Sequence, residues 1–128
     1  MQKMATLFRA LADPSRLRII HLLFSSGELC VCDLESVLGI TQTKVSRHLG
    51  YLRRTGLIKA RKQGLWMLYS IVPSLTKEQR DVLDCARKLM EGNEKTIRDK
   101  QRLVSNIRRG CCATFSNVKF GQIPASLQ

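Results

Sequence analysis

The chain has 128 residues, with 22 Lys and Arg against 10 Asp and Glu, so its formal net charge is +12 and its pI is near 10.1. This length predicts one domain with a short tail, and the positive charge favours a polyanionic partner, usually nucleic acid. No stretch approaches the roughly 18 apolar residues of a membrane span, and residues 1–12 lack the features of a secretory signal. Five cysteines without an export signal predict reduced thiols in the cytoplasm.

The N-terminal region predicts two successive helices. Residues 2–12 carry apolar side chains at helical spacing. Asp13-Pro14 is a helix start signal, because the carboxylate caps the helix and proline at the first position loses no hydrogen bond. The second helix should run to about Phe24.

The next segment predicts a helix-turn-helix. A short helix is expected from about Cys30 to Leu38, followed by a tight turn at Gly39-Ile40. Thr41 should cap the helix that follows, whose inward positions are Val45, Leu49 and Leu52. A helix, a glycine turn and a capped helix with this inward pattern are typical of the motif.

Residues 57–62 and 65–72 are two extended stretches around Lys62-Gln63-Gly64, which predicts a β-hairpin. Two strands alone are marginally stable, so the hairpin should lean on the helices as a wing. The expected fold is therefore mainly α with a small β-hairpin, a winged helix-turn-helix with dimerisation helices at its N- and C-terminal ends.

One long helix is predicted from Thr76, where Gln79 completes a capping box, to about Arg109, with a weak point at Gly92-Asn93. A helix of this length cannot bury its apolar seam on so small a body, so it is interpreted as a dimerisation element. Residues 1–110 would then form the DNA-binding and dimerisation domain, and residues 111–128 a loosely held tail that begins with a Cys-Cys pair.

Four stretches of the chain form a combination that is specific in its order and spacing. They are Leu11-Ala12-Asp13-Pro14-Ser15-Arg16-Leu17-Arg18-Ile19, Glu28-Leu29-Cys30-Val31-Cys32-Asp33-Leu34, Ser46-Arg47-His48-Leu49 and Arg61-Lys62-Gln63-Gly64. With them the chain resembles the arsenical-resistance repressors of the ArsR/SmtB type, over about residues 4–110. The resemblance implies a dimeric winged helix-turn-helix repressor that binds operator DNA when metal-free and releases it on binding a toxic ion.

The exposed face of the predicted recognition helix carries side chains that suit DNA. Gln can contact adenine and Arg or Lys guanine, so this helix should lie in the major groove. His48 flanks the apolar side and is expected to pack or to touch a phosphate. Basic residues on the wing can hold phosphates, and a two-fold dimer predicts a palindromic operator. The candidate DNA contacts are Gln42, Thr43, Lys44, Ser46, Arg47, His48, Arg54, Lys59, Arg61, Lys62 and Gln63.

Cys30 and Cys32 place two thiols at the start of the helix-turn-helix. Soft thiolates favour As(III) or Sb(III), with Cd(II) and Pb(II) less expected, over hard cations. If both thiols lay in regular helix they would point about 200° apart, so shared chelation requires the first turn to yield. The helix N-terminus is expected to lower the thiol pKa, and ion binding would distort this turn and displace the recognition helix.

The third ligand is open. Arsenical repressors of this type can carry another cysteine three residues after the second, but Glu35 stands there. Cys85 lies beside an apolar seam and is expected to pack, whereas Cys111 and Cys112 follow a helix end and could join the site from the same or the other subunit. If only two thiols bind, methyl-As(III) would be the natural inducer. No histidine follows His48, so the histidine–carboxylate zinc site of some relatives is not expected, nor is an organic cofactor.

The sequence therefore predicts a metalloid-responsive transcriptional repressor. A thiol redox sensor that releases DNA on oxidation is an alternative within DNA binding. A thiol enzyme such as an arsenate reductase fits poorly, because no phosphate-cradling loop or Cys-X-X-Cys is present. A metal-storage protein would not need the helix-turn-helix.

Overall fold

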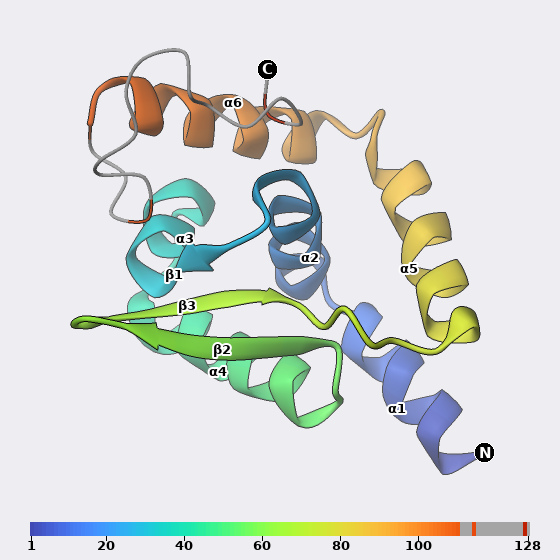
Figure 1. The fold of residues 1–128 in the computed structure, drawn as a ribbon. Helices are drawn as coiled ribbons and strands as arrows, with labels where there is room; N and C mark the ends of the chain where they lie inside the picture. The colour runs from blue at the N-terminus through green and yellow to red at the C-terminus, as the bar shows by residue number, and fades with distance from the viewer. Residues whose placement is uncertain (111–113, 115–126, 128) are drawn as a thin grey trace.

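The fold was analysed in a computed structural model that describes residues 1–110 together with Thr114 and Leu127. Helices surround one small antiparallel sheet, with the hairpin extending from the body (Figure 1). Within the described residues the elements are α1 (Gln2–Leu11), α2 (Pro14–Ser26), β1 (Leu29–Cys30), α3 (Val31–Leu38), α4 (Gln42–Arg54), β2 (Ile58–Gln63), β3 (Trp66–Ile71), α5 (Lys77–Met90) and α6 (Glu94–Arg108). This arrangement confirms the winged helix-turn-helix.

Local signals determine where the helices begin. Asp13 accepts hydrogen bonds from the backbone N–H groups of Ser15 and Arg16 at 2.8 and 3.1 Å, which starts α2 as predicted. The capping box between Thr76 and Gln79 is present at the start of α5. Each cap satisfies donors that the first helical turn would otherwise leave without partners.

The core lies between α2, α3 and α4. Gly39 ends α3 with a φ of +69°, a left-handed conformation that glycine adopts without a Cβ penalty, and Thr41 caps α4. The three inward positions predicted for α4 are all fully buried, and the core also draws on α2 and α3. Its α4 members are Val45, Leu49 and Leu52.

Within the described residues the sheet has three strands rather than the predicted two, in the order β1-β3-β2. The added strand is the two-residue β1, in which Leu29 pairs with Tyr69 and Cys30 pairs with Leu68. A strand this short has no alternation that a sequence pattern could detect, so sequence reasoning assigned Cys30 to the start of a helix. Cys30 instead occupies the N-cap position of α3, with an extended backbone.

The predicted long C-terminal helix is two helices, α5 and α6, which divide at the weak point that the sequence indicated. The chain breaks at Gly92-Asn93, and the Asn93 side chain caps the new helix α6 by accepting from the N–H groups of Lys95 and Thr96. Asparagine is a strong N-cap and glycine a weak helix former, so the local chemistry favours two helices. As Figure 1 shows, α6 turns back across α2 and α3 of its own chain instead of continuing along α5.

A bidentate ion pair holds α6 in this position. The guanidinium of Arg18 on α2 donates to both carboxylate oxygens of Asp99 on α6, each at 2.8 Å, and both side chains are largely buried. Near the other end of α6, Asn106 donates to the Ser36 hydroxyl of α3 at 3.0 Å. These contacts direct the C-terminus of α6 towards α3, the helix that follows Cys30.

Candidate thiol site and nucleic-acid interface

Cys30 lies at the junction of the sheet and α3. Its side chain is 1% exposed, and this burial raises the pKa of its thiol. The prediction that the helix N-terminus lowers the thiol pKa is therefore wrong for Cys30, because the cost of desolvating a thiolate exceeds the benefit of the helix end. Cys32 is exposed in the first turn of α3. The two thiols do not both lie in helix, so the geometric objection to their sharing an ion does not apply.

Thr114 is tied to this junction by three hydrogen bonds. Its hydroxyl accepts from the N–H of Cys30 at 2.9 Å and donates to the carboxylate of Asp33, and its own N–H donates to Asp33 Oδ2 at 2.8 Å. Thr114 therefore lies at the thiol helix of its own chain. Sequence reasoning missed Asp33 and Thr114, because a lone threonine in an aperiodic tail carries no signal. The acidic residue in the first turn of α3 could have been noticed as a capping group.

The other cysteines differ in position. Cys111 and Cys112 lie outside the described residues. Cys85, expected to pack, is exposed on α5. In the described part of the chain, no three His, Cys, Asp or Glu side chains are grouped to hold a metal ion. A site with three sulfur ligands must therefore draw on residues beyond this part or on a second subunit.

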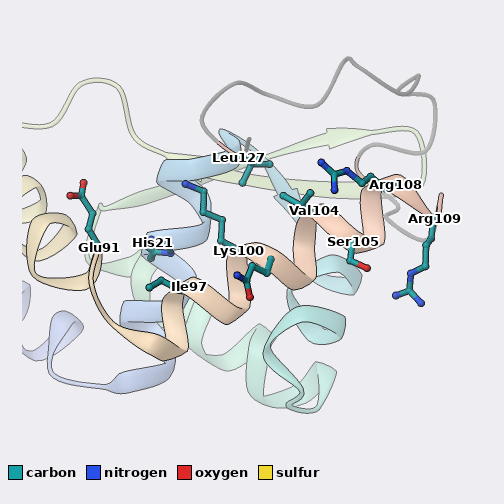
Figure 2. A pocket seen from close by; sticks show the side chains of 10 residues that line it. His21, Glu91, Ile97, Lys100, Val104, Ser105, Arg108, Arg109 and Leu127 are labelled. Atoms are coloured by element: carbon teal, nitrogen blue, oxygen red, sulfur yellow. The ribbon is translucent and has the colours of Figure 1, made fainter.

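A separate hollow of about 540 Å³ lies along the outer face of α6 (Figure 2). Its described lining includes Lys100, Arg108 and the buried His21, whose Nδ1 has no hydrogen-bond partner in the described structure. Burial lowers the pKa of His21. None of the described cysteines lines this hollow, so it is distinct from the thiol junction.

The exposed face of α4 has the composition predicted for DNA contact. Six of its candidate residues are exposed, and so are all four candidates on β2. The members on α4 are Gln42, Thr43, Lys44, Ser46, Arg47 and Arg54, and those on β2 are Lys59, Arg61, Lys62 and Gln63.

His48 is the exception among the candidate DNA contacts. It is buried, and its Nδ1 lies 3.4 Å from Nη1 of Arg16. Arg16 also stacks on the Tyr51 ring at 4.2 Å and donates to the Ala10 carbonyl. The structure thus places His48 in the packing that joins α2 to α4, which agrees with the expectation that it packs.

Arg61 is paired within the protein. Its Nε and Nη2 donate to the two carboxylate oxygens of Glu28 at 2.6 and 2.8 Å, and this contact lowers the pKa of Glu28. Arg61 is the register partner of Leu68, which in turn pairs with Cys30. The wing and the thiol junction are therefore connected by both the sheet ladder and this ion pair.

Comparison with known proteins agrees with this architecture. Residues 13–60 match the model of the bacterial regulatory proteins of the arsR family. The chain is 42% identical over 107 residues, 84% of its length and 86% of the relative's, to the arsenical resistance operon repressor of Escherichia coli. No helix in the described ranges is long and apolar enough to cross a membrane.

Two solved structures share the fold. The AntR antimony-specific transcriptional repressor superposes with a TM-score of 0.59 at 32% identity, over 73% of this chain and 82% of that one. A homodimeric winged helix-turn-helix domain from Mycobacterium bovis gives a TM-score of 0.59 at 27% identity, over 70% and 80%. The relatives are DNA-binding regulators, which sets aside the enzyme alternative. The chain belongs to the arsR family and is a transcriptional repressor with a winged helix-turn-helix, not an enzyme.

Proposed function

We propose that this repressor is metalloid-responsive: it binds operator DNA as a dimer and is released when As(III) or Sb(III) binds to its cysteine thiolates. The observation that carries the proposal is the position of Cys30, which both ends a strand of the wing sheet and caps the first helix of the helix-turn-helix. An ion held there is connected to the recognition helix α4 through α3 and to the wing through β1. The arsenical and antimony repressors among its relatives support this choice of ion.

The donor set fits a soft, thiophilic ion. Cys30 and Cys32 supply two sulfurs, and the best candidates for the remaining ligands are Cys111 and Cys112. Thr114, which follows Cys112 by two residues in the sequence, is hydrogen-bonded at Cys30 of the same chain. All four thiols would then belong to one subunit. If the tail thiols take no part, the two-thiol site would favour methyl-As(III).

Release follows from what Cys30 is attached to. Movement of Cys30 is passed to Leu68 through the β1–β3 ladder and to the wing through the Glu28–Arg61 pair. Movement of α3 is passed to α4 through Gly39. Loss of the wing contact and tilting of the recognition helix would each weaken DNA binding. This route differs from the one expected from sequence, which involved only the recognition helix.

The dimer would form through α1 and α5. Met4, Phe8 and Leu89 are large apolar side chains that these helices leave exposed in the single chain. Such residues are expected to pair across a two-fold axis, which in turn implies a palindromic operator with half-sites about one turn of DNA apart. A repressor with reduced thiols would act in the cytoplasm.

The test is fluorescence anisotropy on labelled DNA from upstream of the protein's own gene. Reduced protein should bind with an affinity that falls steeply with salt, and As(III) or Sb(III) should release it at micromolar concentrations. Zn(II) should have little effect, and the Cys30→Ser/Cys32→Ser variant should bind DNA but ignore arsenite. Release by peroxide but not by arsenite would instead favour the redox sensor, and turnover without DNA binding would contradict both.

A further inference from the structure

The tip of the wing is unusually apolar for a DNA-binding hairpin. Leu65 is 98% exposed, and the adjacent Trp66 and Met67 are 46% and 37% exposed. Leu65 is almost fully exposed at the end of a projecting hairpin, and the two residues that follow it in β3 point to opposite faces of that hairpin. An apolar side chain held out in this way is available to a partner.

The tip is built to hold Leu65 outward. The strands stay in register up to the pair Gln63 and Trp66, which leaves a two-residue loop. Gly64 has a φ of +60°, whereas no non-glycine residue in the described structure has a positive φ. Positive φ at the first loop residue alone is typical of a type II′ turn, which matches the twist of the flanking strands. The tip is therefore a defined turn that presents Leu65 at its end.

The charge of the hairpin identifies the class of partner. Residues 58–71 contain three cations and no carboxylate; Arg61 is paired with Glu28, which leaves two exposed lysines on the stem below the apolar tip. A basic stem with an apolar tip is the composition of proteins that insert a wedge between base steps in the minor groove. The cations are Lys59, Arg61 and Lys62.

The dimensions fit the same partner. The six residues of β2 span about 20 Å, and half a turn of DNA, from a major groove to the neighbouring minor groove, is about 17 Å. Paired strands lie about 4.8 Å apart, so with their side chains they are too wide for a minor groove about 6 Å across. Only the side chain at the tip can enter.

We propose that Leu65, supported by Trp66, inserts into the minor groove beside the recognition site and kinks the operator. The inference rests on the proposed operator binding and adds to it a specific mode of DNA deformation. The gain from burying Leu65 is offset by the cost of unstacking a base step, so the wedge should alter DNA shape much more than affinity. Sequence preference at the kinked position would then favour flexible steps such as TA.

The test is resonance energy transfer between the ends of a 30-base-pair operator duplex, with full-length protein. Wild type should bend the DNA by at least about 20°, and Leu65→Ser should abolish the bend while changing affinity by less than about tenfold. Lys62→Ala is the matched control on the same hairpin. It should keep the bend and reduce the slope of log affinity against log salt by about 1.8, because each dimer loses two phosphate contacts, whereas Leu65→Ser should leave that slope unchanged.

Trp66, the only tryptophan of the chain, gives a second readout. Its quenching by acrylamide should fall when wild type binds the operator. Operator binding with no bend, or with a bend that survives Leu65→Ser, would overturn the wedge alone. Protection of Trp66 through self-association without DNA would also overturn it, by showing a protein contact at the tip. Failure of wild type to bind any operator would overturn the proposed function together with the wedge.

Discussion

Replacing Thr114 with valine removes one hydroxyl while keeping the shape of the side chain. In the structure this hydroxyl accepts from the Cys30 N–H at 2.9 Å and donates to the carboxylate of Asp33. A neutral hydrogen bond contributes about 0.5–1.5 kcal/mol net, and one to a charged group about 1.5–3 kcal/mol. The site is only partly buried, and Asp33 keeps the hydrogen bond from the Thr114 N–H. The expected loss of interaction free energy is therefore about 1.5–3 kcal/mol.

This loss should appear in metalloid binding if, as proposed, the tail thiols complete the site beside Cys30. Thr114→Val should raise the Kd for As(III) about 10- to 100-fold, since each 1.4 kcal/mol corresponds to a factor of ten. Titration of the reduced protein with As(III), followed by the thiolate–arsenic absorbance in the ultraviolet, measures this directly. DNA affinity without arsenite should change little.

Thr114→Ser is the matched control, because it retains the hydroxyl and should bind As(III) almost as wild type does. If Thr114→Val bound As(III) with unchanged affinity and stoichiometry, the tail would not be held at the site by these bonds. The assignment of the tail thiols to the same subunit would then lose its support.

Two further predictions concern the fold that supports the site. Asp99→Ala leaves the buried Arg18 guanidinium without its carboxylate. The free energy of unfolding measured by urea denaturation should fall by about 3–5 kcal/mol. A loss below about 1 kcal/mol would show that the pair does not hold α6 in place. Burial lowers the pKa of both His21 and His48, so the unfolded chain takes up protons at these imidazoles at a higher pH than the folded chain does. The contribution of these histidines to the free energy of unfolding should therefore be fully present above about pH 6.5 and be lost as the pH falls through the folded-state pKa values. The loss should be at most about 1.4 kcal/mol per pH unit for each histidine. In His21→Gln the free energy of unfolding should fall less steeply with pH. An equal slope in wild type and His21→Gln would contradict this role for His21.

The parts of the fold that depend on local signals could be predicted from sequence. Asp13-Pro14, the turn at Gly39 and the cap at Thr41 each act within a few residues, and each lies where the sequence indicated. The exposed face of α4 followed from helical periodicity alone. His48 was the position that periodicity left ambiguous, and its burial depends on Arg16, which is distant in sequence.

What could not be predicted depends on contacts between distant segments. The strand pairing of Cys30 with Leu68 and the return of α6 onto α2 through Arg18 and Asp99 join residues far apart in the chain. No periodic pattern records such pairs. This affected the candidate site most, because the sequence left open whether the tail joins the thiols of the same or of the other subunit. Thr114 is bonded to the thiol helix of its own chain, which supports the first alternative.

Mixed dimers test the central claim, that each metalloid site is completed within one subunit. One protomer would carry Cys30→Ser and Cys32→Ser, and the other Cys111→Ser and Cys112→Ser, with different affinity tags to purify the heterodimer. If sites form within subunits, this heterodimer contains no complete site, and As(III) should fail to release it from operator DNA at concentrations that release wild type. If sites form between subunits, one complete site remains, and release of the heterodimer by As(III) at concentrations that leave the Cys111→Ser/Cys112→Ser homodimer on DNA would contradict the claim.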